Sequence, residues 1–285
     1  MERIHYVTSR VLIWLLCMSA MSVAEEPKQP FTPGFYAFQN GMKFKSAEEG
    51  VSLIKELGYQ GVGSAEPRDL AKFKAACEKE GLKIFSVYLG GKVNAENFIY
   101  GKEVDDAIGS LKGTDALIEL NVQRGNDPND TQAIAMVKEI GEKAKAAGLK
   151  VVIYPHDKFY IERVNHAVKI AKATGCDNIG IAFNLCHFLK VQPTDDLSKT
   201  LAEAKPLLWS VSISGADTDG KDWNTLIRPL DEGTFDPSVF LKLLREIDYD
   251  GAIGLQCFNI RIDAKENLTR SILAGNKHFA SIQVK

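Results

Sequence analysis

Short apolar runs alternate with amphipathic, Lys/Glu-rich segments along almost the whole chain, and this alternation limits the possible folds more than any other feature. Eight runs have strand character, and each is followed by a segment with helical spacing of its apolar residues. Strands alternating with helices favour a parallel sheet, and eight units predict a single α/β (β/α)8 TIM barrel. The expected strands lie at 34–40, 58–64, 82–89, 115–122, 149–155, 177–184, 207–214 and 249–256.

The segments between these runs carry helical patterns with recognisable end signals. Ser46 followed by Glu49 has the form of a capping box, and glycines mark several helix ends. No linker or change of composition divides the series, and the one long connection is 215–235. The expected helices lie at 46–58, 67–81, 97–111, 131–148, 160–175, 194–204, 236–248 and 263–279.

The first 24 residues have the layout of a cleavable secretory signal peptide. Arg3 and Arg10 precede an apolar run, which a small-x-small cleavage pattern follows. The run is too short for a membrane-spanning helix. Because Leu16 rather than a small residue precedes Cys17, a cleaved soluble product is favoured over a lipid-anchored one. We therefore expect an exported protein, periplasmic or secreted. The expected domains are a signal peptide at 1–24 and a barrel domain at 25–285.

Composition and charge narrow the range of partners. A content of 45% hydrophobic and 25% charged residues is typical of a soluble globular protein. Removing residues 1–24 takes away two basic residues and one acidic residue, which changes the net charge from −2 to −3. No run of Lys and Arg stands out, so nucleic acid and anionic lipid are disfavoured as partners.

Four cysteines remain after the expected cleavage, and they are scattered without a CxxC spacing. This arrangement indicates neither a zinc site nor a redox pair, although an oxidising compartment would permit disulfides. We expect them to act as small buried hydrophobic residues. They are Cys77, Cys176, Cys186 and Cys257.

Strand parity predicts which side chains meet inside the barrel. Active sites of such barrels lie at the carboxyl ends of the strands, where inward residues alternate with outward ones. Large apolar residues such as Ile181 and Phe183 suit the helix layer, so their neighbours face the barrel axis. The predicted cluster is polar and almost entirely uncharged. Its members are Tyr154, His156, Asn184, Ser212 and Gln256, with His187 just above them.

Several stretches resemble the xylose-isomerase-like TIM-barrel superfamily of sugar isomerases and epimerases, which also contains apurinic-site endonucleases. The most specific is "IRPLDEGTFDPSVFLKLLREIDYDGAIGLQ", similar to the family's Pro-Leu-Gly-Glu-Gly loop, Asp-led helix, Gly-Tyr-x-Gly turn and last strand. The stretches "YPH", "FNLCH" and "VSISGAD" resemble the ends of the fifth, sixth and seventh strands. The resemblance covers Pro33 to Phe279.

The resemblance implies a divalent-metal site whose ligands are a Glu, an Asp, a His and a second Glu. At those positions this chain has Tyr154, Asn184, Ser212 and Gln256. Hard cations select anionic oxygen ligands, so we expect neither the family's metal nor another cofactor.

His187 matches a family histidine that resembles a substrate-contacting residue, and His156 matches a second recurrent histidine. Recruitment of this pair to a different metal stays open, although two imidazoles fall short of the usual three ligands.

Proton transfer next to a sugar carbonyl needs a base and a group that stabilises the developing oxyanion. His156 and His187 are the first candidates for the base, and Glu119 is the next. Glu119 lies inside the fourth expected strand, where it could point inward with a raised pKa. Asp217 is a fourth candidate. The candidate donors to the oxyanion are Tyr154, Asn184 and Gln256.

Structural roles are the alternatives for each of these residues. The histidines could be hydrogen-bonded structural groups, and Glu119 could belong to a buried ion pair. Trp223 suits stacking on a sugar ring, but loop aromatics also serve as packing plugs. Arg228 could clamp an anionic ligand or tie down its own long loop.

Two functions stay open. The first is an exported, metal-independent isomerase, epimerase or lyase acting on a small-molecule carbohydrate. The second is a non-catalytic descendant that binds a carbohydrate or a protein partner. An apurinic-site endonuclease is disfavoured because the chain lacks both the metal ligands and a basic track. The identity of the sugar, its phosphorylation and the oligomeric state stay undetermined.

Overall fold

The computed structural model describes residues 30–283, so the expected signal peptide lies outside the described residues. All eight expected strand segments form strands, the third of them two strands, and these nine strands pair in parallel. They are β1 (Phe35–Phe38), β2 (Gly61–Gly63), β3 (Lys83–Ile84), β4 (Ser86–Val93), β6 (Leu117–Arg124), β7 (Lys150–Ile153), β8 (Ile179–Asn184), β9 (Leu208–Ile213) and β10 (Ile253–Leu255).

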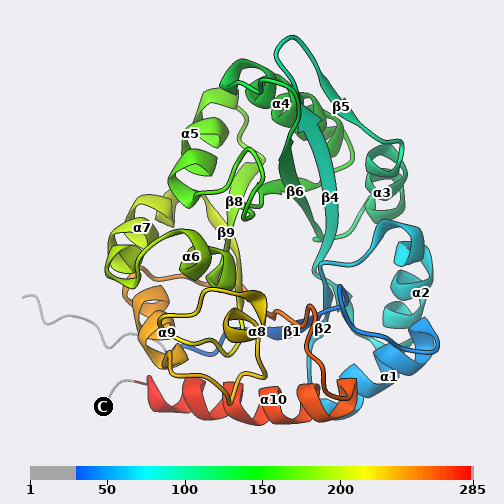
Figure 1. Cartoon of the computed structure of the whole chain (residues 1–285). Helices are drawn as coiled ribbons and strands as arrows, with labels where there is room; N and C mark the ends of the chain where they lie inside the picture. The colour runs from blue at the N-terminus through cyan, green and yellow to red at the C-terminus, as the bar shows by residue number, and fades with distance from the viewer. Residues whose placement is uncertain (1–29, 284–285) are drawn as a thin grey trace, which may run out of the picture. The chain divides into compact units, whose positions relative to one another are not determined.

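The sheet curls into a TIM-barrel-like fold. Its strand order is β3-β2-β1-β10-β9-β8-β7-β6-β4-β5, where β5 is a further strand at Phe98–Tyr100. The third expected strand is divided at Phe85 into β3, which pairs with β2, and β4, which pairs with β6. The strand order begins with β3 and ends with β4 and β5. Because β3 and β4 are consecutive in the chain, the two ends of the order come together at Phe85. Helices lie around the outside of the strands (Figure 1).

Eight longer helices follow the strands, largely where the sequence predicts them. Ser46 accepts a hydrogen bond from the backbone of Glu49 at the start of the first, over 3.2 Å. Gly58, Gly81 and Gly175 end three of them in the left-handed conformation. The helices are α1 (Ala47–Leu57), α2 (Leu70–Glu80), α3 (Glu103–Leu111), α4 (Asp130–Ala146), α5 (Val164–Thr174), α7 (Leu197–Ala204), α9 (Pro237–Glu246) and α10 (Ala264–Ser281).

Three short elements differ from the expectation. The helix expected over 97–111 begins only at Glu103, because the preceding residues form β5 (Phe98–Tyr100) antiparallel to β4. Aromatic and β-branched residues favour this strand, in which Phe98 and Tyr100 stack at 6.2 Å between ring centroids. Two short helices were not predicted. They are α6 (Leu185–Val191), directly after β8, and α8 (Trp223–Leu226), within the long connection.

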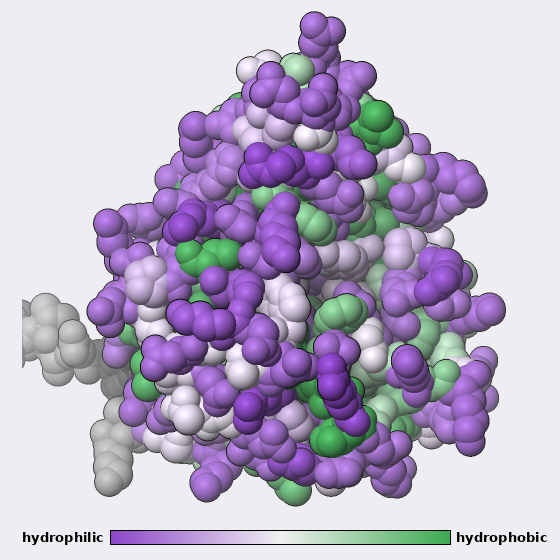
Figure 2. Space-filling view, in the orientation of Figure 1, coloured by the Kyte–Doolittle hydropathy of each residue, from purple (hydrophilic) through white to green (hydrophobic). Residues whose placement is uncertain are grey.

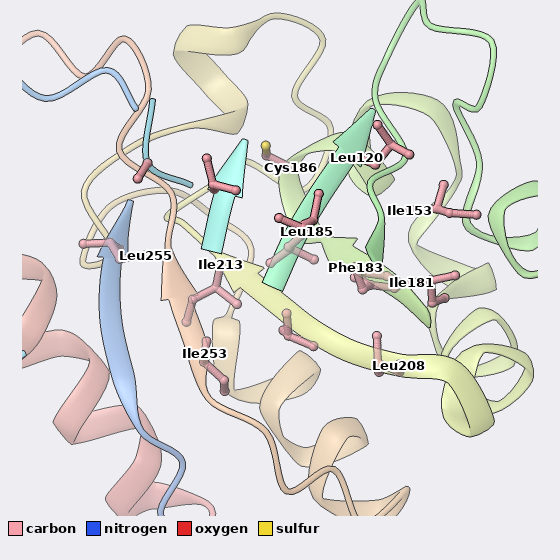
Figure 3. Packing of buried hydrophobic residues seen from close by; sticks show 14 of the residues in the cluster. Leu120, Ile153, Ile181, Phe183, Leu185, Cys186, Leu208, Ile213, Ile253 and Leu255 are labelled. Atoms are coloured by element: carbon pink, nitrogen blue, oxygen red, sulfur yellow. The ribbon is translucent and has the colours of Figure 1, made fainter. Parts of the chain in front are cut away.

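Two hydrophobic clusters confirm the predicted strand parity. The larger lies between sheet and helices and includes Ile181, Phe183 and Ile253 (Figure 3). The smaller consists of inward-facing residues, among them Tyr36 and Tyr154. The interior is therefore packed with side chains, as in other barrels of this size.

Inward-facing glycines make room for the aromatic rings of the inner cluster. A Cβ atom on Gly63 would lie 2.1 Å from the ring of Tyr36, and one on Gly180 would lie 2.4 Å from the ring of Trp209. The glycines inside these strands therefore serve close packing.

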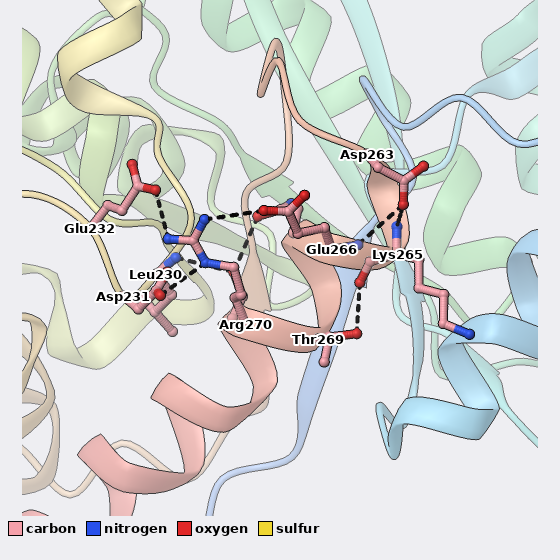
Figure 4. Close-up of polar contacts among 10 residues, drawn as sticks. Leu230, Asp231, Glu232, Asp263, Lys265, Glu266, Thr269 and Arg270 are labelled. Carbon is pink, nitrogen blue, oxygen red and sulfur yellow. Dashed lines mark hydrogen bonds and ion pairs between the residues drawn. The ribbon is translucent and has the colours of Figure 1, made fainter.

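Ion pairs hold the long connection between β9 and α9 in place. Arg228 pairs with Asp217 over 3.1 Å, which ties the loop to itself as one of the two alternatives predicted. Arg270 on α10 reaches Asp231 over 3.0 Å and Glu232 over 2.6 Å (Figure 4). These contacts place α8, which the connection carries.

Figure 2 shows a face that is mostly hydrophilic, with hydrophobic residues in small separate groups. Within residues 30–283, no helix has the length and apolar character needed to cross a bilayer. The four cysteines of this region are free, and Cys77, Cys186 and Cys257 are buried, in agreement with the expected packing role.

Candidate active site

Asn184 stands where β8 passes directly into α6, and its side chain caps that helix. Its Oδ1 accepts hydrogen bonds from the backbone of Cys186 over 3.1 Å and from the Cys186 thiol over 3.0 Å. Since a backbone N–H only donates, this contact determines which amide atom is the oxygen. The Nδ2 group then donates to the hydroxyl of Tyr154.

Gln256 follows β10 and is held in the same way. Its Oε1 accepts from the backbone N–H of Phe258 over 3.0 Å, so its orientation is also determined. Among the described residues its Nε2 group has no hydrogen-bond partner. Gln256 is only 4% exposed, and its amide therefore presents N–H groups within the end of the barrel.

The four residues aligned with the family's metal ligands lie around one region of the barrel end. Asn184 is aligned with Ser212 in the parallel register, and Ser212 is aligned with Gly254, two residues before Gln256. Tyr154 joins the group through its hydrogen bond with Asn184. All four side chains are buried.

His156 and His187 lie against each other, with ring centroids 4.1 Å apart. The backbone of Asp157 contacts both rings. Its N–H donates to Nδ1 of His187 over 3.3 Å, and its carbonyl accepts from Nδ1 of His156 over 2.8 Å. In the neutral state His187 therefore carries its proton on Nε2, whereas His156 carries it on Nδ1 and keeps a lone pair on Nε2.

The environment keeps both imidazoles neutral. Burial lowers the pKa of His156. Burial, and secondarily the neighbouring His156, lowers the pKa of His187 well below its ordinary value. Neither Nε2 atom has a hydrogen-bond partner among residues 30–283. One imidazole can accept a proton there, and the other can donate one.

Aromatic rings enclose the histidine pair. Phe159 stacks on His156 at 4.1 Å between centroids, nearly parallel at 17°. Trp223, at the start of α8, meets His187 edge-on at 5.1 Å. Tyr154 meets His187 edge-on from below at 5.7 Å. The long connection thus brings Trp223 against His187.

Comparison with known families agrees with the fold. Residues 51–277 match the family described as xylose isomerase-like TIM barrel. The chain belongs to this family. No curated protein sequence matches it.

Solved structures of family-like proteins superimpose on most of the chain. The 3-keto-D-glucoside 4-epimerase of E. coli is 18% identical, and the match covers 86% of this chain and 99% of that one at a TM-score of 0.69. D-allulose 3-epimerase from Methylomonas sp. is 12% identical, with 86% and 98% covered and a TM-score of 0.67. A xylose isomerase-like protein from Mycobacterium smegmatis, in complex with magnesium, is 16% identical, with 90% and 99% covered and a TM-score of 0.63. At sequence identities this low, the structural likeness establishes a shared fold and nothing further.

The residues at the family's metal-ligand positions do not fit a hard divalent cation. The amide oxygens of Asn184 and Gln256 already accept from backbone N–H groups. Burial, followed by the nearby Cys186 and Glu119, raises the pKa of Tyr154 well above its ordinary value, so the phenol stays protonated. Ser212 adds only a neutral hydroxyl. Among residues 30–283, no group of three or more His, Cys, Asp or Glu side chains is arranged to hold a metal ion.

Glu119 points inward but lies deeper than the other candidates. It is fully buried, aligned with Tyr88 on one side and Val152 on the other. Its carboxyl oxygens have no hydrogen-bond partner. Burial raises its pKa to about 7, against the opposing effect of nearby Ser86, Ser64 and Ser210 hydroxyls. No Lys or Arg of the described residues pairs with it.

Other candidates have structural partners. Asp217 is engaged by Arg228 and accepts from the backbone of Thr234 over 3.1 Å. Three features of the site were not predicted. They are the hydrogen bonds between the backbone of Asp157 and both histidines, the stacking of Phe159 on His156, and the helix α6. Only α6 had a signal in the sequence, because an Asn before an apolar run is a helix-capping pattern.

Proposed function

We propose that this protein is a carbohydrate isomerase or epimerase that moves a proton next to a carbonyl without a metal ion. The observation that carries the proposal is the pair of imidazoles with opposite tautomers. His156 offers a lone pair on Nε2, and His187 offers a proton on Nε2. Sugar epimerases among the proteins of similar fold support the substrate class.

In this proposal His156 removes a proton from the carbon beside the sugar carbonyl, and the electron pair moves onto the carbonyl oxygen. The Nε2 group of Gln256 and the hydroxyl of Tyr154 donate to that oxygen. Asn184 donates to the Tyr154 oxygen, which leaves the phenolic proton free for the substrate. Return of a proton to carbon from protonated His156 completes the exchange, while His187 stays neutral and donates its Nε2 hydrogen to a substrate oxygen as a hydrogen bond.

The proposal assigns supporting roles to two further residues. Trp223 provides a surface on which the apolar face of a sugar ring packs. Ser212 provides a hydroxyl for hydrogen bonding to a sugar hydroxyl. Glu119 is not assigned a direct role, because it is fully buried at the level of Tyr88 and Val152, deeper in the barrel than Tyr154.

We also propose that the protein is exported, on the strength of the signal-peptide pattern of its first 24 residues. Comparing the N-terminus of the purified secreted or periplasmic protein with that of the full chain tests this. Recovery of an intact Met1 from the cytoplasm contradicts it.

The experiment that tests the catalytic proposal is deuterium exchange. Keto-sugars, aldo-sugars and glycosides are incubated with the protein in D₂O, with EDTA, and followed by NMR. We expect exchange at a carbon beside a carbonyl, reduced by about 100-fold or more in His156→Ala, since general bases contribute about 10²–10⁴-fold. His278→Ala, on the outer helix α10, is the matched control. No exchange with any sugar contradicts the proposal.

The loss of the family's ligand set favours a second candidate, a protein that binds a carbohydrate without turnover. Thermal-shift screening separates the two, because a bound sugar stabilises the native state. Stabilisation by a sugar that shows no exchange, abolished in Gln256→Ala, supports the second candidate. Exchange on that sugar excludes it.

A further inference from the structure

A cavity of about 620 Å³ lies at the ends of β1, β2 and β4, on the other half of the barrel rim from the histidine pair. This volume falls in the range of about 300–1,000 Å³ that is usual for small-molecule sites. The residues of the cavity come from the connections after β1, β2 and β5, from β4 itself and from the start of α3. They are Asn40, Glu66, Pro67, Arg68, Tyr88, Lys102, Glu103 and Asp106.

The cavity adjoins the proposed reaction site through two aromatic contacts. Tyr88 forms part of its lining and meets Tyr154 edge-on, with centroids 5.5 Å apart at 89°. Tyr154 in turn meets His187 edge-on at 5.7 Å. The rings of Tyr88 and Tyr154 therefore connect the lining of the cavity to the histidine pair.

The chemistry of the cavity suits an uncharged ring with hydroxyl groups. The ring of Tyr88 and Pro67 supply apolar surface, and Asn40 supplies an amide that both donates and accepts. Sugar rings have the matching arrangement of an apolar face and a polar edge.

The charges around the cavity disfavour a phosphate. Arg68 pairs with Glu66 over 2.8 Å, and Lys102 pairs with Asp106 over 2.9 Å. Glu103 is a further carboxylate, so two cations face three anions. An anionic ligand would have to displace these pairs and would meet net negative charge.

We propose that this cavity binds a second, neutral sugar ring, so that the substrate is a disaccharide or similar glycoside. The inference rests on the proposed function and adds the size and charge of the substrate. The reacting ring lies by the histidine pair, and the ring attached to it lies over Tyr88.

Calorimetric titration and deuterium exchange test the proposal together. The probes are glucose and galactose, the disaccharides maltose, cellobiose and lactose, and the charged compounds glucose 6-phosphate and UDP-glucose. We expect at least one disaccharide to bind about tenfold or more tightly than either monosaccharide, which corresponds to about 1.4 kcal/mol. We expect it to bind more tightly than both charged compounds.

Two variants locate the second ring. Asn40→Ala and Arg68→Ala should weaken disaccharide binding about fivefold or more and leave monosaccharide binding unchanged; the side chain of Arg68 is 80% exposed, so its removal spares the fold. Arg261→Ala, at an exposed arginine outside the cavity, is the matched control. Unchanged disaccharide affinity in both variants overturns the proposal.

The outcomes distinguish this inference from the function on which it rests. If a monosaccharide undergoes exchange and binds as tightly as the disaccharides, the second subsite is overturned and the proposed function stands. If UDP-glucose or glucose 6-phosphate binds most tightly of all the probes, the proposal that the cavity binds an uncharged ring is overturned. Absence of both binding and exchange with every probe overturns the subsite and the proposed function together.

Discussion

The backbone N–H of Asp157 donates to Nδ1 of His187, and the carbonyl of Asp157 accepts from Nδ1 of its neighbour His156. One residue therefore sets opposite tautomers on two touching imidazoles. Because backbone groups make both contacts, substitution of the Asp157 side chain leaves them in place. This preorganisation holds a proton acceptor and a proton donor side by side, which general acid–base chemistry needs.

The pH dependence of exchange should reflect the lowered pKa of His156. The neutral form is the base, so activity should persist below pH 6.5 and fall only as the pH drops through the lowered value. Measurement of kcat/KM from pH 4.5 to 8 checks this. Phe159→Ala uncovers the ring of His156 and should move the midpoint upward, toward 6.5. A wild-type midpoint at or above 6.5 contradicts the prediction.

Glu119 should make stability fall as the pH rises. Its pKa is about 7 in the folded chain against 4.5 ordinarily, so between these values the folded state binds the extra proton. Stability is then lost as the pH rises through this window, by on the order of 3 kcal/mol if the shift is fully expressed.

Urea unfolding of wild type and Glu119→Gln at pH 5 and pH 8 measures this effect. The stability of the variant relative to wild type should be greater at pH 8 than at pH 5, because Gln is neutral at both. Taking the difference between the two proteins cancels the titration of the histidines. A relative stability that does not change with pH contradicts the prediction.

Restoring carboxylates should restore metal binding. In the double variant Asn184→Asp/Gln256→Glu, two anionic oxygens replace amides that now present N–H groups. We expect 1 mM Mn²⁺ to raise the Tm of the variant and not that of wild type, since a hundredfold excess over Kd contributes about 2.7 kcal/mol. A wild-type Tm that Mn²⁺ raises and EDTA lowers would count against the metal-independent mechanism.

A methyl group at Gly180 should destabilise the barrel interior. Its Cβ would lie 2.4 Å from the ring of Trp209 and 2.7 Å from the carbonyl of Leu207. We expect Gly180→Ala to cost about 1–3 kcal/mol by urea unfolding. Gly109→Ala, in α3 with no atom within 4 Å, is the control and should stabilise by about 0.5–1 kcal/mol. Equal effects of the two substitutions would show that the interior accommodates the methyl group.

Local pattern was sufficient to predict most of the fold. Side chains alternate along a strand with a period of two, so the placement of Ile181 and Phe183 outside, and of Ala182 and Asn184 inside, followed from the order of residues. The family resemblance predicted independently that the residues aligned with the family's metal ligands face the inside of the barrel. Phe98 to Tyr100 were predicted as part of a helix but form β5. This strand depends on antiparallel pairing with β4, which the local sequence pattern does not reveal.

The chemical state of the site depended on the tertiary structure. The sequence by itself determined that Asn184, Gln256, His156 and His187 lie at or just beyond the ends of barrel strands, since the order and parity of the strands place them there. Only the fold decided which amide atoms face the site and which nitrogen of each imidazole carries the proton. Those choices are made by hydrogen bonds to particular backbone groups, whose positions exist only once the strands and α6 have packed together.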